Sequence, residues 1–207
     1  MADRNDEIRP EPPRRLHPWL GILFQPRSTM LWLLRHETQQ SARTMWLSFT
    51  ALFIVIMFIA VFLYPGDFDR AAVRIRLVIA TPVIFALSYL YFIVESYMLH
   101  KAGEWLGGRS HVADMRVVNA YTTVVPGVIL GLLNVGLSVL FGHDSPLPGF
   151  AGNLILGWTI YITAVGIAAA AGFSPWKGLL VYLVTLLLWL GLAALVGLLV
   201  FGQLPAL

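Results

Sequence analysis

The chain contains no cysteine, which excludes disulfides, thiolate metal sites and cysteine-based catalysis. Charge is scarce as well. Asp, Glu, Lys and Arg make up 12% of the 207 residues, whereas an average soluble domain has about 25%. Between residues 117 and 207 the only formal charges are Asp144 and Lys177, and long apolar runs fill the rest. The sequence therefore indicates an integral membrane protein.

Motifs for catalysis, metal binding and phosphate binding are also missing. Ser110 and His111 are adjacent, which is no triad geometry, and no Gly-x-Ser-x-Gly is present. Gly107-Gly108 is not followed by the residues of a phosphate loop. No histidines pair at i, i+4 on a helix, as a zinc site would require. The sequence predicts no catalytic residue, metal or cofactor, and disfavours a membrane enzyme.

Five apolar segments reach the length of about 20 residues that a helix needs to cross the hydrocarbon core. They cover residues 45–64, 77–99, 117–141, 152–172 and 178–201. A membrane barrel would show short alternating segments instead. We therefore predict an all-α integral membrane protein whose domain, residues 45–207, is a five-transmembrane-helix bundle. The break at 173–177 is so short that the last two helices are expected to form a tight antiparallel hairpin.

The distribution of Lys and Arg predicts the orientation. The segment before the first span and the second and fourth loops hold 11 of these residues, and the opposite side holds Arg70, Arg74 and Arg76. Because cytoplasmic loops carry the excess of positive charge, the N-terminus is predicted to be cytoplasmic and the C-terminus outside. The same placement explains the net charge of +3 and pI near 9.4 without a nucleic acid partner.

The first 44 residues divide into two parts. Residues 1–15 are rich in Pro, Arg and acidic residues and are predicted to be a disordered cytoplasmic tail. Residues 16–44 contain two amphipathic pieces that are too short to span. They are typical of interfacial helices, with Trp19 and Trp32 at headgroup depth and Arg27 and Arg35 near anionic lipid. The other interpretation is a helix that packs against a soluble partner.

Four sequence pieces resemble the Yip domain family of Ypt/Rab-interacting membrane proteins, and its bacterial branch in particular. They are the entry from His17-Pro18-Trp19 to Pro26-Arg27, the stretch from Gly107-Gly108 through Met115-Arg116 to Pro126, residues 158–166, and Phe173 to Gly178. The resemblance covers roughly residues 17–201. It implies a five-helix bundle with a cytoplasmic N-terminus. The Asp-Leu-x-Gly-Pro type motif of eukaryotic members is missing, so the resemblance does not carry their GTPase binding to this chain.

Polar residues gather on two predicted spans that are neighbours in sequence. Glu95 is the only acidic residue well inside a span, at a cost of about 2.5–3.5 kcal/mol at mid-helix. Two i, i+3, i+7 sets, with Tyr121 beside the second, give the candidate intramembrane site: Ser88, Tyr91, Glu95, Asn119, Tyr121, Thr122 and Pro126. One interpretation is a cytoplasm-facing cavity with a proton or cation site. The other is a structural carboxylate that bonds Tyr121 or Asn119, or pairs with Lys101 or Arg116.

Small residues recur in the later spans, for example in Gly127-x-x-x-Gly131 and Ala193-x-x-x-Gly197. They let helix backbones approach closely, either within the bundle or between two copies of the chain. We predict a non-enzymatic membrane scaffold or organiser of the bacterial inner membrane. Its partners would be lipids, other membrane proteins or a second copy. The alternative is a small transporter, channel or lipid-translocating protein built around Glu95.

Overall fold

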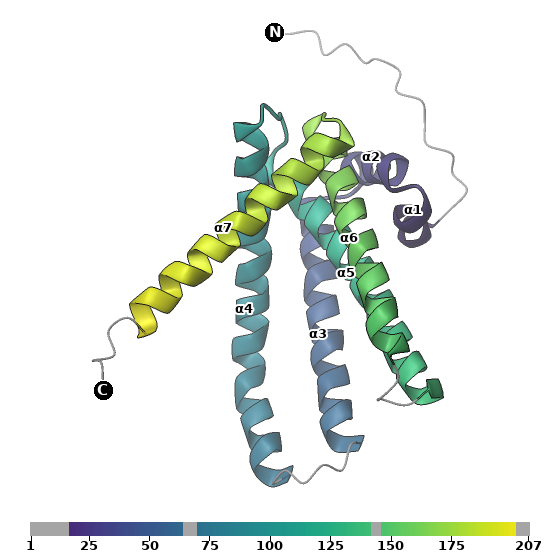
Figure 1. Ribbon diagram of the computed structural model, residues 1–207, viewed down its shortest axis with the longest axis vertical. Helices are drawn as coiled ribbons and strands as arrows, with labels where there is room; N and C mark the ends of the chain where they lie inside the picture. The colour runs from purple at the N-terminus through teal and green to yellow at the C-terminus, as the bar shows by residue number, and fades with distance from the viewer. Residues whose placement is uncertain (1–16, 64–69, 142–145, 202–207) are drawn as a thin grey trace.

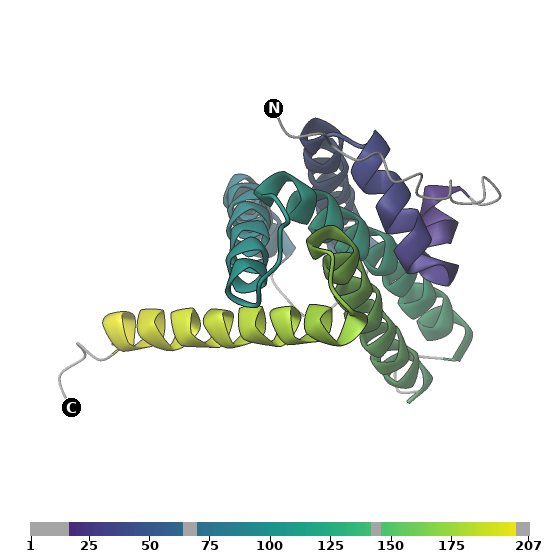
Figure 2. The same ribbon diagram turned by 90° about the horizontal axis from the view of Figure 1, so that it is seen from above.

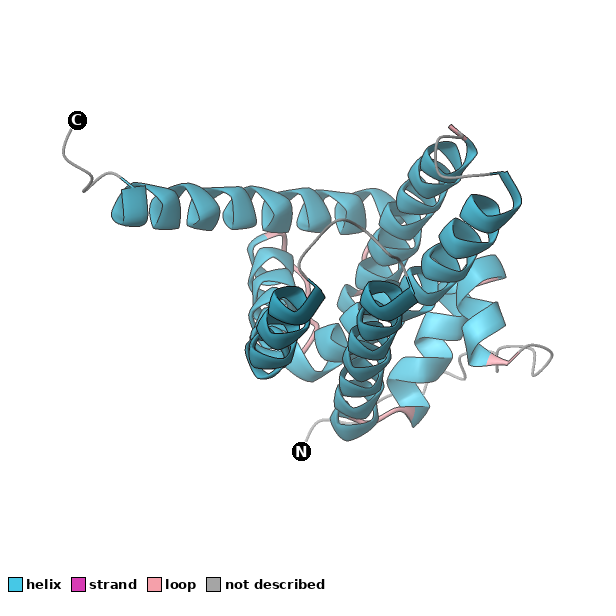
Figure 3. Cartoon of the chain, turned by 90° about the horizontal axis from the view of Figure 1, so that it is seen from below, coloured by secondary structure: helices cyan, strands magenta, loops and turns pink. Residues whose placement is uncertain are grey.

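The computed structural model describes residues 17–63, 70–141 and 146–201, and all regular structure in these ranges is helical (Figures 1 and 3). The predicted tail at 1–15 lies outside the described residues. The helices are α1 (Pro18–Phe24), α2 (Pro26–His36), α3 (Gln39–Leu63), α4 (Arg70–Trp105), α5 (Val112–Phe141), α6 (Leu147–Ala171) and α7 (Pro175–Phe201).

Four of the described helices are long and apolar enough to cross a membrane. They are α4, α5, α6 and α7, over residues 78–105, 112–133, 149–171 and 175–198. The prediction of an all-helical membrane protein is thereby confirmed at this level. The first expected span, 45–64, coincides with most of α3, and its crossing stays a prediction. Helix α4 extends beyond its apolar segment at both ends, because backbone hydrogen bonding continues where hydropathy has already fallen.

Proline and glycine set several helix boundaries. Pro18 and Pro26 stand at the first positions of α1 and α2, where the missing N–H costs nothing. Gly172 ends α6 in the left-handed conformation, at φ 75°, which favours glycine. The N–H of Phe173 then donates to the carbonyl of Ala168 over 2.8 Å, and α7 begins at Pro175.

The connection between α6 and α7 is as short as predicted, but the expected antiparallel hairpin is wrong beyond the turn. Helix α7 leaves the bundle obliquely, as the views of Figures 1 and 2 agree. The two helices are in close contact at Gly178, where a Cβ atom would collide with the backbone of Ala164 and press on Ala168. Such small residues allow a close crossing, and the helices diverge from that point because nothing requires them to stay parallel.

Helix α5 forms the centre of the packed core. In an 18-residue apolar window of α5, 53% is buried inside the molecule, against 6% in that of α4 and 11% in that of α7. The buried apolar side chains come from every helix; the largest fully buried ones are Ile22, Met30, Leu33, Phe92, Leu99, Met115, Val118, Val124, Val125, Ile162, Ile167 and Val181. The outer faces of α4 and α7 are apolar and exposed, as lipid contact requires.

The predicted small-residue motifs have different surroundings. Gly127 lies against the ring of Phe49, because an added Cβ would stand 3.0 Å from its Cζ atom. This glycine therefore serves packing within the bundle. Gly131 and Gly197 face open space, with no atom within 4 Å of the added Cβ. The motif Ala193-x-x-x-Gly197 lies on the part of α7 that leaves the bundle, and a role for it in helix packing stays a prediction.

The two short N-terminal helices, which we call the N-terminal platform (Pro18–His36), pack on the bundle itself. Ile22, Met30 and Leu33 are fully buried, and the Met30 methyl group lies against Gly166 of α6. In Figure 1, α2 crosses the bundle at the end where α4 finishes and α7 starts. The apolar stripe of the platform is thus covered by the chain's own helices, which its sequence period alone does not reveal.

Candidate functional site

Glu95 of α4 forms a small hydrogen-bonded group with residues of two helices. The hydroxyl of Tyr91 and the amide of Asn119 both donate to its carboxylate. Helix α4 continues to Trp105, ten residues further on, so Glu95 lies about 15 Å from the helix end at 1.5 Å per residue. The Oε2 atom is buried and has no hydrogen-bond partner among the described residues.

Asn119 of α5 holds this group, the Glu95 cluster, together. Its Nδ2 donates to the Ser96 hydroxyl over 3.3 Å, and its Oδ1 accepts from the Thr123 hydroxyl over 3.1 Å. Ser96 in turn donates to the carbonyl of Phe92 over 2.7 Å. Because both ends of a buried amide are engaged, Asn119 fixes the spacing between α4 and α5.

Aromatic side chains enclose the Glu95 cluster. The ring of Tyr91 stacks on Trp189 of α7 at 5.1 Å between centroids and on Trp46 of α3 at 6.1 Å. Trp46 also stacks on Phe92 at 4.8 Å. Tyr182 of α7 lies near enough to Glu95 for an electrostatic interaction. Sequence reasoning missed Trp46, Trp189 and Tyr182, because it looked for polar residues on α4 and α5 only and these aromatic residues belong to α3 and α7.

The other predicted members of this site lie elsewhere. Ser88 faces α3, where its hydroxyl lies 3.1 Å from Trp46 Nε1 and 2.9 Å from the Thr50 hydroxyl. Tyr121 donates to Glu37, the residue that follows α2. Thr122 donates to the carbonyl of Val118 over 2.9 Å and packs against Gly166. The structure thus brings together Tyr91, Glu95 and Asn119, whereas Ser88, Tyr121 and Thr122 have other partners. Pro126 is buried within α5.

The basic partners expected for Glu95 are engaged or distant. Lys101 pairs with Glu104 at 2.7 Å, and His100 approaches the same carboxylate at 3.3 Å. The Nε atom of Arg116 is buried with no hydrogen-bond partner in the described part of the chain. The described structure therefore has a hydrogen bond between Glu95 and Asn119, and it has no ion pair of Glu95 with Lys101 or Arg116.

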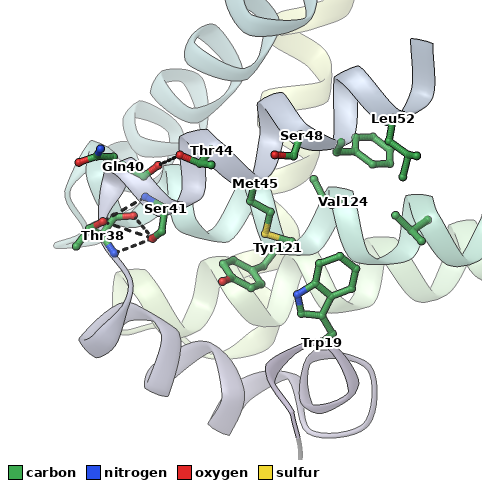
Figure 4. Close-up of a pocket in the computed structure, with 12 residues that line it drawn as sticks. Trp19, Thr38, Gln40, Ser41, Thr44, Met45, Ser48, Leu52, Tyr121 and Val124 are labelled. Carbon is green, nitrogen blue, oxygen red and sulfur yellow. Dashed lines mark hydrogen bonds between the residues drawn. The ribbon is translucent and has the colours of Figure 1, made fainter. Parts of the chain in front are cut away.

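A second feature, which the sequence did not suggest, is a groove between α1, α3 and α5 (Figure 4). This α3–α5 groove has a volume of about 680 Å³. Trp19 of α1 and Tyr121 of α5 stand over it from one side, and Ser48 of α3 stands on the other. None of the three cavities described here is lined by Glu95 or Asn119.

The predicted lipid-interface residues occupy the N-terminal platform in different ways. Arg27 and Arg35 are exposed, and Arg27 and Ser28 line a cavity of about 400 Å³ between α2 and α6. Trp32 is half-buried and stacks on His36 at 4.5 Å. Trp19 is 40% exposed at the groove. Lipid contact of these residues stays a prediction.

Neither polar region has the parts of a catalytic centre. The Glu95 cluster contains one carboxylate, one phenol and one amide, and the groove contains hydroxyls that are bonded to their own backbone. Within the described ranges, no three His, Asp, Glu or Cys side chains gather to hold a metal ion. What these groups can do is accept and donate hydrogen bonds at defined depths of a helical bundle.

The sequence model of the Yip1 domain matches residues 20–198, from α1 to α7. The chain belongs to the Yip1 domain family. The resemblance given by the four sequence pieces is thereby confirmed, whereas the bacterial branch stays a prediction. No curated protein and no solved structure matches the chain. Because the Yip1 domain match includes most of the N-terminal platform, the platform is part of the domain and not an addition to it.

Proposed function

We propose that this Yip1 domain chain is a non-enzymatic membrane organiser, which gathers lipids and other membrane proteins around its bundle. One observation carries the proposal. The N-terminal platform is fixed to α5 and α6 by buried side chains, yet Leu20 and Phe24 are 50% and 73% exposed on its outer face. A rigid helix that presents apolar and cationic side chains together favours contact with anionic membrane lipid.

The proposal includes a topology with five spans, a cytoplasmic N-terminus and a place in the bacterial inner membrane. The cationic residues of the described loops and nearby helix ends support it. They are Arg27, Arg35, Arg43, Lys101, Arg109, Arg116 and Lys177. Figure 1 shows α2, the end of α4 and the start of α7 at one end of the bundle. Positive charge gathered at one end favours the cytoplasmic side for that end.

Lipid enrichment around the reconstituted protein tests the proposal. A donor dye on Ser174→Cys, the only cysteine then present, would transfer energy to labelled phosphatidylglycerol or, separately, to labelled phosphatidylcholine. We expect greater transfer to the anionic lipid, because each surface arginine contributes about 1 kcal/mol of attraction. Arg27→Gln with Arg35→Gln should reduce the difference. Equal transfer to both lipids in the unaltered protein would overturn the proposal.

A matched control removes a cation that is already paired. Lys101→Gln changes the charge by one unit, as each arginine substitution does, but Lys101 lies 2.7 Å from Glu104. We expect this variant to keep the preference for phosphatidylglycerol. Raising the salt concentration should weaken the preference in every variant, because exposed charges are screened.

One observation favours a second candidate function, transport of a proton or small cation. The Oε2 atom of Glu95 is buried and unpaired in the described structure, which leaves it free to accept a hydrogen bond. Transport predicts that Glu95→Gln abolishes ion flux into liposomes while the variant still folds. Organisation of lipid predicts no flux above empty liposomes in either form.

A further inference from the structure

The α3–α5 groove changes in polarity along its length. Its lining residues are Trp19, Thr38, Gln40, Ser41, Thr44, Met45, Ser48, Phe49, Leu52, Tyr121, Val124 and Val128. Figure 4 shows the hydroxyl and amide residues toward the start of α3 and Leu52 further along it. From Gln40 to Leu52 the groove extends about 18 Å along the helix. One end is therefore polar and the other apolar.

The polar end contains a hydroxyl, that of Thr44, whose acceptor positions stay open. Thr44 donates to the carbonyl of Gln40 over 3.0 Å, and no donor approaches its hydroxyl oxygen in the described structure. Ser41 is more fully engaged, because its hydroxyl donates to the Thr38 carbonyl over 2.8 Å and accepts from the Thr38 N–H over 3.0 Å. A hydroxyl that donates to its own backbone still has lone pairs that face outward. The Gln40 amide is exposed and adds donors. This end suits an uncharged polar group such as a glycerol ester.

A cation stands next to the polar end. Gln40 and Thr44 also line an adjoining cavity of about 540 Å³, whose other residues are Gln39, Arg43 and Leu47. The Arg43 guanidinium lies 5.0 Å from the centre of the Tyr89 ring, which holds its side chain toward α4. Arg43 lines this adjoining cavity and not the groove, so a phosphate would lie beyond Gln40 and Thr44, where the planar guanidinium can donate to two oxygens.

We propose that the α3–α5 groove binds one membrane phospholipid, with an acyl chain along Phe49, Leu52 and Val128 and the phosphate near Arg43. Its volume falls within the range of about 300–1,000 Å³ that small-molecule sites occupy. Both α3 and α5 start at the end of the bundle that gathers cations. The polar end of the groove therefore lies toward the headgroups of one leaflet, and the apolar end lies toward its acyl chains. The inference shares with the proposed function only this membrane orientation.

A photoreactive phospholipid tests the site directly. Phosphatidylglycerol with a diazirine in one acyl chain would be incorporated into liposomes that contain the full chain, and labelled peptides would be mapped after irradiation. We expect labelling concentrated on residues 45–52 and 121–128, above that of the exposed face of α7. Ser48→Trp, at an exposed position of the groove wall, should lower that labelling about tenfold, equivalent to about 1.4 kcal/mol.

Control variants separate the groove from general lipid contact. Leu187→Trp is the same substitution as Leu52→Trp, placed on the exposed face of α7, and should leave the groove labelling unchanged. Leu52→Trp blocks the groove at a second position, so that one unfolded variant does not decide the result. Arg43→Gln should reduce labelling by phosphatidylglycerol and leave the melting temperature nearly unchanged.

Three outcomes would overturn the proposal. The first is equal labelling of the groove and the α7 face, and the second is undiminished labelling in both blocked variants. The third is a rise in groove labelling when residues 1–15 are deleted, which would make the N-terminal segment the occupant. The energy-transfer experiment is independent of all three, because it reports lipid around the platform. Either proposal can therefore fail while the other stands.

Discussion

The Glu95 cluster and the α3–α5 groove are both polar, yet they differ in how their polar atoms are satisfied. In the cluster, Tyr91 and Asn119 of two helices donate to one carboxylate. In the groove, Thr44 donates to its own helix, to the carbonyl of Gln40. The first arrangement draws α4 and α5 together. The second leaves the wall of α3 independent of its neighbours, and a space of about 680 Å³ remains.

Polar side chains that bond between helices hold the bundle together, whereas polar side chains that bond within their own helix leave space beside it. Hydrocarbon offers no hydrogen bonds, so a polar side chain there bonds to another helix or to its own backbone. A hydrogen bond between two helices brings them close together, whereas a hydrogen bond within one helix does not draw a neighbouring helix toward it. A polar residue in a span is therefore a sign of a ligand site only where its bonds stay local and a cavity is present.

The largest expected effect is a contrast in water access. Because native cysteine is absent, Glu95→Cys and Ser48→Cys each provide a single probe. In delipidated protein we expect a charged thiol reagent to label position 48 rapidly and position 95 slowly. Each 1.4 kcal/mol needed to open the packed cluster slows labelling on the order of tenfold. Mass spectrometry of the labelled protein over time measures both rates.

Comparable rates at the two positions would end the distinction between a closed cluster and an open groove. Fast labelling at position 95 from the cytoplasmic side would indicate a hydrated path to this residue and favour transport. A cysteine in the exposed loop, such as Arg109→Cys, sets the upper limit of the rate. Lipid that fills the groove would slow labelling at position 48, and delipidated protein would restore it.

Stability should distinguish the two regions next. Glu95→Ala leaves the donors of Tyr91 and Asn119 without their shared acceptor, and unsatisfied buried groups cost about 1–3 kcal/mol. Glu95→Gln retains an acceptor oxygen and should cost less. Thermal unfolding in one detergent at fixed protein concentration measures the free energy of unfolding. Equal melting temperatures for Glu95→Ala and the unaltered chain would contradict a packing role for the cluster.

The sequence predicted the helical membrane fold from apolar length, and Asn119 was one of four partners that it offered for Glu95, since a short loop makes α4 and α5 neighbours. It could not place Tyr121 and Thr122. Helix α5 is surrounded, so residues two or three apart face different helices, and periodicity does not name those helices. The groove was unpredictable for a related reason: Trp19 and Val124 are distant in sequence and meet only because the N-terminal platform folds onto α5.

The smallest expected effects compare one hydroxyl in each setting. Ser88→Ala removes a hydroxyl that lies 2.9 Å from that of Thr50, although Trp46 Nε1 keeps the Ser88 carbonyl at 3.2 Å. We expect a loss of about 0.6 kcal/mol, the average for such bonds between membrane helices. Thr44→Ala removes a local bond on an exposed wall and should stay within about 0.5 kcal/mol. Unfolding of both variants beside Glu95→Ala would rank the three sites. If Thr44→Ala proved the most costly, the groove wall would be part of the packing that holds α3 to α5, and no space would be free for lipid.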